Sequence, residues 1–143
     1  MLSSTEIHHA KLLIVDDSPS DLLLLGNVLR AEGYGSVDST FDPVTVGELH
    51  RKNRYDLILL DLNMPGMSGF EVMEELKKID RSADLPVMVI TTQPDHWIRA
   101  LGAGARDFVS KPYKIPELLL HVHHLLESCL PATGARPAMA AGR

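Results

Sequence analysis

Residues 55–66 read Tyr-Asp-Leu-Ile-Leu-Leu-Asp-Leu-Asn-Met-Pro-Gly. Four consecutive aliphatic residues, Leu57 to Leu60, are typical of a strand that is buried on both faces, as strands of parallel sheets are. Asp61 stands where this strand would end, immediately before a loop of turn-forming residues. In open α/β sheets, ligands bind in the crevice outside the carboxyl ends of the strands. The stretch therefore predicts a buried parallel strand with a functional carboxylate at its end.

A second apolar strand is predicted at residues 11–15, Lys-Leu-Leu-Ile-Val, and it also ends in acidic residues, Asp16 and Asp17. Three carboxylates at the ends of two buried strands would repel one another, and at least one would have a raised pKa. A bound divalent cation would remove this conflict, and Mg²⁺ prefers oxygen ligands. The sequence therefore predicts a magnesium-dependent acidic pocket.

Strand and helix patterns alternate five times along the chain. Strands are predicted at residues 11–15, 36–40, 57–61, 86–91 and 107–110. Helices are predicted from Ser18-Pro19 to Gly33, from Asp42-Pro43 to about Asn53, after Ser68, from about Asp95 to Leu101, and over 115–130. Strands separated by helices of this length imply βαβ units, and hence a parallel sheet with right-handed crossovers.

The composition fits a single soluble domain. The chain has 143 residues and a net charge of −5, which disfavours nonspecific nucleic-acid binding. No apolar run is long enough to span a membrane and the N-terminus shows no signal-peptide pattern, so we expect a cytoplasmic protein. Cys129 is the only cysteine, which excludes an intrachain disulfide. Residues 1–10 are predicted to be a flexible N-terminus, 11–130 the folded domain, and 131–143 a flexible tail or linker stub.

Several of these residues together resemble a known family. The acidic pair Asp16-Asp17, Asp61 within Asp-Leu-Asn-Met-Pro-Gly-Met-Ser-Gly, Thr91 at the end of the fourth strand and Lys111-Pro112 after the fifth are similar to the receiver domain of two-component response regulators, in particular to single-domain, chemotaxis-type receivers. The resemblance covers about residues 11–128. It implies a flavodoxin-like, doubly wound five-stranded parallel sheet of order 2-1-3-4-5 with helices on both faces.

The resemblance also implies a reaction. A histidine kinase or a histidine phosphotransfer protein would donate a phosphoryl group to Asp61, the nucleophile. Asp16, Asp17, Asp61 and the backbone carbonyl of Asn63 would hold Mg²⁺, which neutralises charge on the transferring group. Lys111 would pair with a phosphoryl oxygen and, before phosphorylation, with Asp61. The Lys111-Pro112 bond is expected to be cis.

The remaining expected roles concern switching and phosphoryl lifetime. The Thr91 hydroxyl would donate to a phosphoryl oxygen, and Phe108 occupies the place of the family's aromatic switch residue. Asn63 and Gln93 would flank the route of the hydrolytic water, and an amide can orient water but cannot act as a general base. Such a receiver catalyses its own phosphorylation and dephosphorylation without being a turnover enzyme in the usual sense.

One segment departs from the family pattern. Between Thr91 and Phe108 the chain is two residues shorter than typical receivers, and Pro94, Gly102 and Gly104 crowd this segment, all of which predict a short or displaced fourth helix. Trp97 is either the apolar anchor of this helix or an exposed contact for a partner, and we favour the anchor. Three other residues, His121, His123 and His124, are expected to be ordinary, partly exposed residues of the last helix.

Three functions remain open at this stage. The first is a signalling switch that recognises a histidine kinase or phosphotransfer protein and then a downstream protein, with no direct contact to nucleic acid or membrane. The second is the receiver fragment of a larger regulator with a missing C-terminal effector domain. The third, a small metal-dependent phosphatase or flavodoxin-like enzyme, lacks a second nucleophile or a glycine-rich phosphate loop.

Overall fold

Five parallel strands form one sheet in the order β2-β1-β3-β4-β5. The computed structural model describes residues 7–79 and 85–129, so the predicted tail at 131–143 lies outside the described residues. The strands are β1 (Lys11–Val15), β2 (Ser36–Thr40), β3 (Leu57–Asp61), β4 (Val87–Thr91) and β5 (Asp107–Ser110). The predicted doubly wound sheet and its strand order are confirmed.

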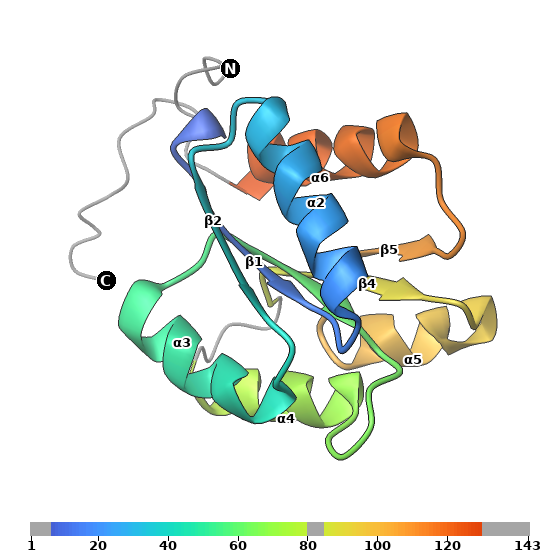
Figure 1. The fold of residues 1–143 in the computed structure, drawn as a ribbon. Coiled ribbons are helices and arrows are strands. Elements are labelled where there is room, and N and C mark those ends of the chain that lie inside the picture. Colours follow the sequence, from blue (N-terminus) through green and yellow to red (C-terminus); the bar gives the residue numbers. More distant parts are fainter. Residues whose placement is uncertain (1–6, 80–84, 130–143) are drawn as a thin grey trace.

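Helices cover both faces of the sheet (Figure 1). On one face lie α2 (Pro19–Ala31) and α6 (Ile115–Cys129), and on the other lie α3 (Val46–Asn53), α4 (Gly69–Ile79) and α5 (Trp97–Gly102). Successive strand side chains point to opposite faces, so the central strands β1, β3 and β4 contribute to both cores. In β3, Leu57 and Leu59 pack under α2 and α6, and Ile58 and Leu60 pack under the other helices. None of the described helices is long and apolar enough to cross a membrane.

Capping residues begin α2 and α4 where the sequence predicted them. The Ser18 hydroxyl accepts a hydrogen bond from the Asp21 N–H at 3.3 Å and starts α2. Ser68 and Glu71 form a reciprocal capping box at the start of α4, with bonds of 2.8 and 3.3 Å. Such caps satisfy backbone N–H groups that have no partner within the helix. The caps thus fix where α2 and α4 begin after β1 and β3.

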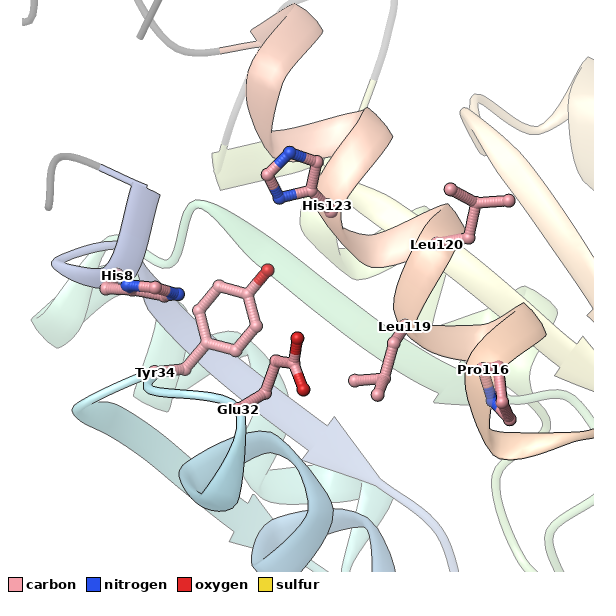
Figure 2. Close-up of a pocket in the computed structure, with 7 residues that line it drawn as sticks. All are labelled: His8, Glu32, Tyr34, Pro116, Leu119, Leu120 and His123. Atoms are coloured by element: carbon pink, nitrogen blue, oxygen red, sulfur yellow. The ribbon is translucent and has the colours of Figure 1, made fainter. Parts of the chain in front are cut away.

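The N-terminal segment corrects one prediction. Ile7 and Ala10 are each 1% exposed and belong to the core beneath α2 and α6. The His8 ring meets the Tyr34 ring edge-on, with centroids 5.1 Å apart. Figure 2 shows His8 and Tyr34 beside Glu32, facing α6 across a pocket of about 350 Å³. Residues 7–10 are thus packed on the domain, contrary to the expected flexible N-terminus.

The short fourth helix is confirmed. A single 3-10 turn, Pro94–His96, leads into α5, which has only six residues. Pro94 stands in the first turn, where its missing N–H costs nothing, and Gly104 follows the helix with a φ of +109°, a conformation that glycine adopts without strain. The element between β4 and β5 is therefore less than two full turns of α-helix.

Candidate functional site

The carboxyl ends of β1 and β3 bring three carboxylates together. These strands are neighbours with Val15 opposite Leu60, so the residues that follow them meet at one edge of the sheet. One ligand oxygen each from Asp16, Asp17 and Asp61 lies within 4.8 Å of the others, and no other such cluster of three occurs in the described part of the chain. Asp16 and Asp61 are buried and Asp17 is exposed. The cluster therefore has two buried carboxylates and one that is open to solvent.

Electrostatics at this site favour a cation. Burial raises the pKa of Asp61 to about 6, and the negative charges of Asp16 and Asp17 add to the rise. The Asn63 N–H, which donates to Asp61 Oδ1 at 3.2 Å, acts in the opposite direction. A divalent ion with oxygen ligands and several waters would relieve this repulsion. The three carboxylates thus fit Mg²⁺ in type and in spacing.

Lys111 lies at the same edge, after β5, and its bond to Pro112 is cis as the resemblance implied. Its ammonium nitrogen is 3.1 Å from Asp16 Oδ2 and 3.4 Å from Asp21 Oδ2. The predicted ion pair with Asp61 is therefore wrong for this structure, in which the ion pairs described for Lys111 go to Asp16 and Asp21. The reason is geometric, because the start of α2 presents a second carboxylate to the lysine.

The pKa of Lys111 reflects these neighbours. Burial lowers it, but the hydrogen bond to Asp16 and the negative charges of Asp61, Asp16 and Asp21 outweigh burial and leave the pKa raised. Lys111 is therefore a fixed positive charge at neutral pH. It is near enough to Asp61 for its charge to act on that carboxylate, although the two are not in an ion pair.

Thr91 and Asn63 connect β4 to the loop after β3. Thr91 is fully buried, and its Oγ1 accepts hydrogen bonds from the Gln93 N–H at 3.0 Å and from Asn63 Nδ2 at 3.3 Å. A threonine hydroxyl has two acceptor positions and one donor. With both acceptor positions in use, the hydroxyl proton remains to be donated to a further group. Both predicted lifetime residues are exposed; Asn63 contacts Thr91 through its side chain and Gln93 through its backbone N–H.

Gly69, the first residue of α4, lies against the backbone next to Asp61. Its N–H donates to the Leu62 carbonyl at 3.1 Å. A Cβ at this position would lie 2.8 Å from Leu62 Cα and 2.9 Å from the Asp61 carbonyl oxygen. Only glycine fits at this close approach, so the start of α4 is held directly against the end of β3.

Aromatic contacts join α5 to its neighbours. The rings of Trp97 and Phe108 stack with centroids 5.1 Å apart, which supports the predicted anchor, yet Trp97 is still 37% exposed. The Arg99 guanidinium lies 3.8 Å above the centre of the Phe70 ring on α4. Sequence reasoning missed the Arg99–Phe70 contact, because no local pattern relates α4 to α5.

A second contact missed from the sequence joins β5 to α6. His121 Nδ1 lies 2.6 Å from Asp107 Oδ2, and Asp107 Oδ1 accepts the Phe108 N–H at 2.7 Å. His121 is thus a partner of Asp107, whereas His123 and His124 are exposed as expected. The only sequence signal for this contact was that Asp107 and His121 stand on successive predicted elements, the fifth strand and the last helix.

A sheet of order 2-1-3-4-5 that carries an acidic triad, a threonine and a lysine at its carboxyl edge defines the class of receiver domains. The family model described as "Response regulator receiver domain" matches residues 12–123. The chain belongs to this family, whose members act in two-component signal transduction. This confirms the resemblance.

Individual relatives differ in how much of them this chain covers. It is 32% identical to Protein PilH of Pseudomonas aeruginosa over 119 residues, which are 82% of this chain and 98% of PilH. It is 35% identical over 118 residues to the DNA-binding dual master transcriptional regulator RpaA of Synechocystis, covering 81% of this chain but only 48% of RpaA. The chain thus spans about half the length of that relative.

Solved structures agree with the sequence relatives. The chemotaxis protein CheY4 of Vibrio cholerae superposes with a TM-score of 0.75 and 29% identity, over 82% of this chain and 98% of CheY4. The receiver domain of the sensor histidine kinase PA1611 of Pseudomonas aeruginosa, solved with a magnesium ion coordinated in its active site cleft, superposes with a TM-score of 0.73 and 26% identity, over 82% and 98% of the two chains.

Proposed function

We propose that the protein is a phospho-acceptor switch in which Asp61 receives a phosphoryl group from the phosphohistidine of a histidine kinase or histidine phosphotransfer protein. A carboxylate oxygen of Asp61 attacks phosphorus, the P–N bond to imidazole breaks, and the electron pair leaves with the imidazole. The observation that carries this proposal is the convergence of Asp16, Asp17 and Asp61 within 4.8 Å at the carboxyl edge of the sheet.

In this proposal Asp16, Asp17, Asp61 and the Asn63 carbonyl hold Mg²⁺. The ion supplies positive charge to the oxygens of the transferring group and so lowers the barrier to in-line displacement. The magnesium in the PA1611 receiver supports the assignment by analogy. The raised pKa of Asp61, caused first by burial, gives an independent physical reason why this pocket binds a cation.

The residues around the acceptor then hold the product. Lys111 leaves its present carboxylate partners and pairs with a phosphoryl oxygen, as a flexible point charge can. Thr91 donates its hydroxyl proton to another phosphoryl oxygen. Its displacement opens space next to β5, into which the Phe108 ring turns, and the stack with Trp97 is rearranged. A local charge change thereby alters the surface that a downstream protein binds.

The cytoplasm is the expected location, because a kinase-coupled receiver works there. We assign no direct nucleic-acid or membrane contact to this domain. The DNA-binding activity in the name of RpaA belongs to a protein of which this chain covers 48%.

Intact-mass measurement after incubation with acetyl phosphate and Mg²⁺ tests the proposal. We expect one added phosphoryl group in the wild type and none in Asp61→Asn. Asp95→Asn, which removes an exposed acid outside the triad, is the matched control and should label normally. Asp17→Asn should weaken Mg²⁺ binding and slow labelling. Labelling of Asp61→Asn to the wild-type extent would overturn the assignment.

A further inference from the structure

Asp21 is a neighbour of the site that sequence reasoning did not identify. It stands in the first turn of α2, where its N–H is fixed by the Ser18 cap. Its carboxylate Oδ2 is 3.4 Å from the Lys111 ammonium nitrogen, and its side chain is 41% exposed. Asp21 is not a member of the acidic triad. It contacts the lysine without being placed to bind the cation.

The two carboxylates that hold Lys111 respond differently to a cation. Asp16 belongs to the triad, so a bound divalent ion compensates its charge and weakens its attraction for Lys111. Asp21 lies outside the triad and keeps its full negative charge. In the cation-loaded protein, Asp21 is therefore the carboxylate that still draws Lys111 toward the start of α2.

The charge of Asp21 also acts on Tyr113, close to Lys111 in the chain. Tyr113, two residues after Lys111, packs against the core beneath α2 and α6. Its pKa is raised first by burial and next by the charge of Asp21. The charge of Asp21 thus reaches both ends of the segment 111–113, which follows β5.

We propose that Asp21 is a positioning residue that holds Lys111 away from Asp61 before phosphorylation, so that release of Lys111 from Asp21 is part of the barrier to phosphoryl transfer. The inference rests on the proposed function of Asp61. Partly exposed ion pairs contribute little to folding stability. The effect of Asp21 is therefore on the position of a catalytic charge and on the rate of transfer, with little effect on the free energy of unfolding.

The direct test compares initial rates of phosphorylation by acetyl phosphate at saturating Mg²⁺. Asp21→Asn should raise the rate by about three- to tenfold, in proportion to the lost charge pairing, and Asp21→Glu, which keeps the charge, should remain close to wild type. Glu117→Gln is the matched control, because it also removes an acid from the first turn of a helix, α6, and should leave the rate unchanged. Thermal unfolding should be similar in all four proteins.

Acetyl phosphate is an anion, so removing the negative charge of Asp21 could also speed the reaction by weakening repulsion of the donor. A double-mutant cycle separates this effect from the release of Lys111. In a Lys111→Met background, Asp21→Asn should produce no acceleration, because no ammonium group remains to be released. Acceleration that persists in this background would overturn the proposal, as would a wild-type or slower rate in Asp21→Asn alone. Failure of the proposed function looks different: the wild type would not be labelled, or Asp61→Asn would be.

Discussion

The indole ring of Trp97 stacks on the phenyl ring of Phe108 with centroids 5.1 Å apart and ring planes inclined by 30°. The contact joins α5 to β5. Phe108 follows Asp107 directly and stands three residues before Lys111. Trp97 is the only tryptophan in the chain and is 37% exposed. The ring is therefore both a packing partner of the expected switch residue and a part of the surface.

Trp97 fluorescence should report occupancy of the acceptor. With Mg²⁺ and beryllofluoride, a phosphoryl mimic, Phe108 is expected to turn and change the ring packing, and so the polarity around the indole. We expect a shift in the wavelength or intensity of Trp97 emission that is absent in Asp61→Asn. Emission that does not respond to the mimic in the wild type would contradict the proposed coupling.

Asp61→Asn should stabilise the metal-free protein at neutral pH. Burial raises the pKa of Asp61 from 3.8 to about 6, so the folded state binds the carboxyl proton more tightly than the unfolded state does. The stability that comes from this proton binding is fully present below the unfolded pKa and is lost as pH rises through the folded pKa. The shift corresponds to a free energy on the order of 2–3 kcal/mol. In EDTA, the Tm gain of Asp61→Asn should be largest above about pH 7 and vanish near about pH 4. An equal gain at both pH values would contradict this.

Ile7→Ala should destabilise the domain. Ile7 is 1% exposed and packs with the core beneath α2 and α6. Truncation of a buried isoleucine to alanine costs about 2–5 kcal/mol, which urea unfolding measures directly. His9 is exposed, and His9→Ala should change the free energy of unfolding by less than about 0.5 kcal/mol. Equal effects of the two substitutions would show that residues 7–10 do not belong to the core.

Substitution of Asn63 or Gln93 should change the lifetime of the phosphorylated state. The Asn63 side chain donates to Thr91 Oγ1, and the Gln93 backbone N–H donates to the same oxygen. The resemblance to receivers implies that both residues flank the path of the hydrolytic water. Asn63→Lys or Gln93→Lys should slow hydrolysis of the acyl phosphate by crowding that path, as followed by intact mass after removal of the donor. Unchanged decay in both variants would exclude this role.

The sequence predicted the sheet and the acidic triad because both follow from local signals. Apolar runs and caps such as Ser18 locate the elements, and βαβ connections place the ends of successive strands at one edge. Asp16, Asp17 and Asp61 then have to meet. The resemblance added Thr91, which the structure places beside Asn63.

The contacts that were missed depend on pairings across long stretches of chain. Lys111 and Asp16 are separated by 95 positions, and the choice between Asp16, Asp21 and Asp61 depends on side-chain positions that no periodicity encodes. Ile7 was missed because one apolar side chain before a strand has no helical or strand period to indicate its burial. Local patterns thus locate the site, and tertiary packing determines which carboxylates form ion pairs with Lys111.

The close approach of Gly69 to the Asp61 carbonyl has a mechanical consequence. At this point Gly69 lies against the side chain and Cα of Leu62 and against the Asp61 carbonyl oxygen, so the first turn of α4 is in direct contact with the last residue of β3. We therefore expect a displacement of the end of β3 on phosphorylation to shift the first turn of α4 as well. Saturation mutagenesis should therefore find Gly69 as intolerant of substitution as the acceptor itself, although glycine carries no chemistry of its own.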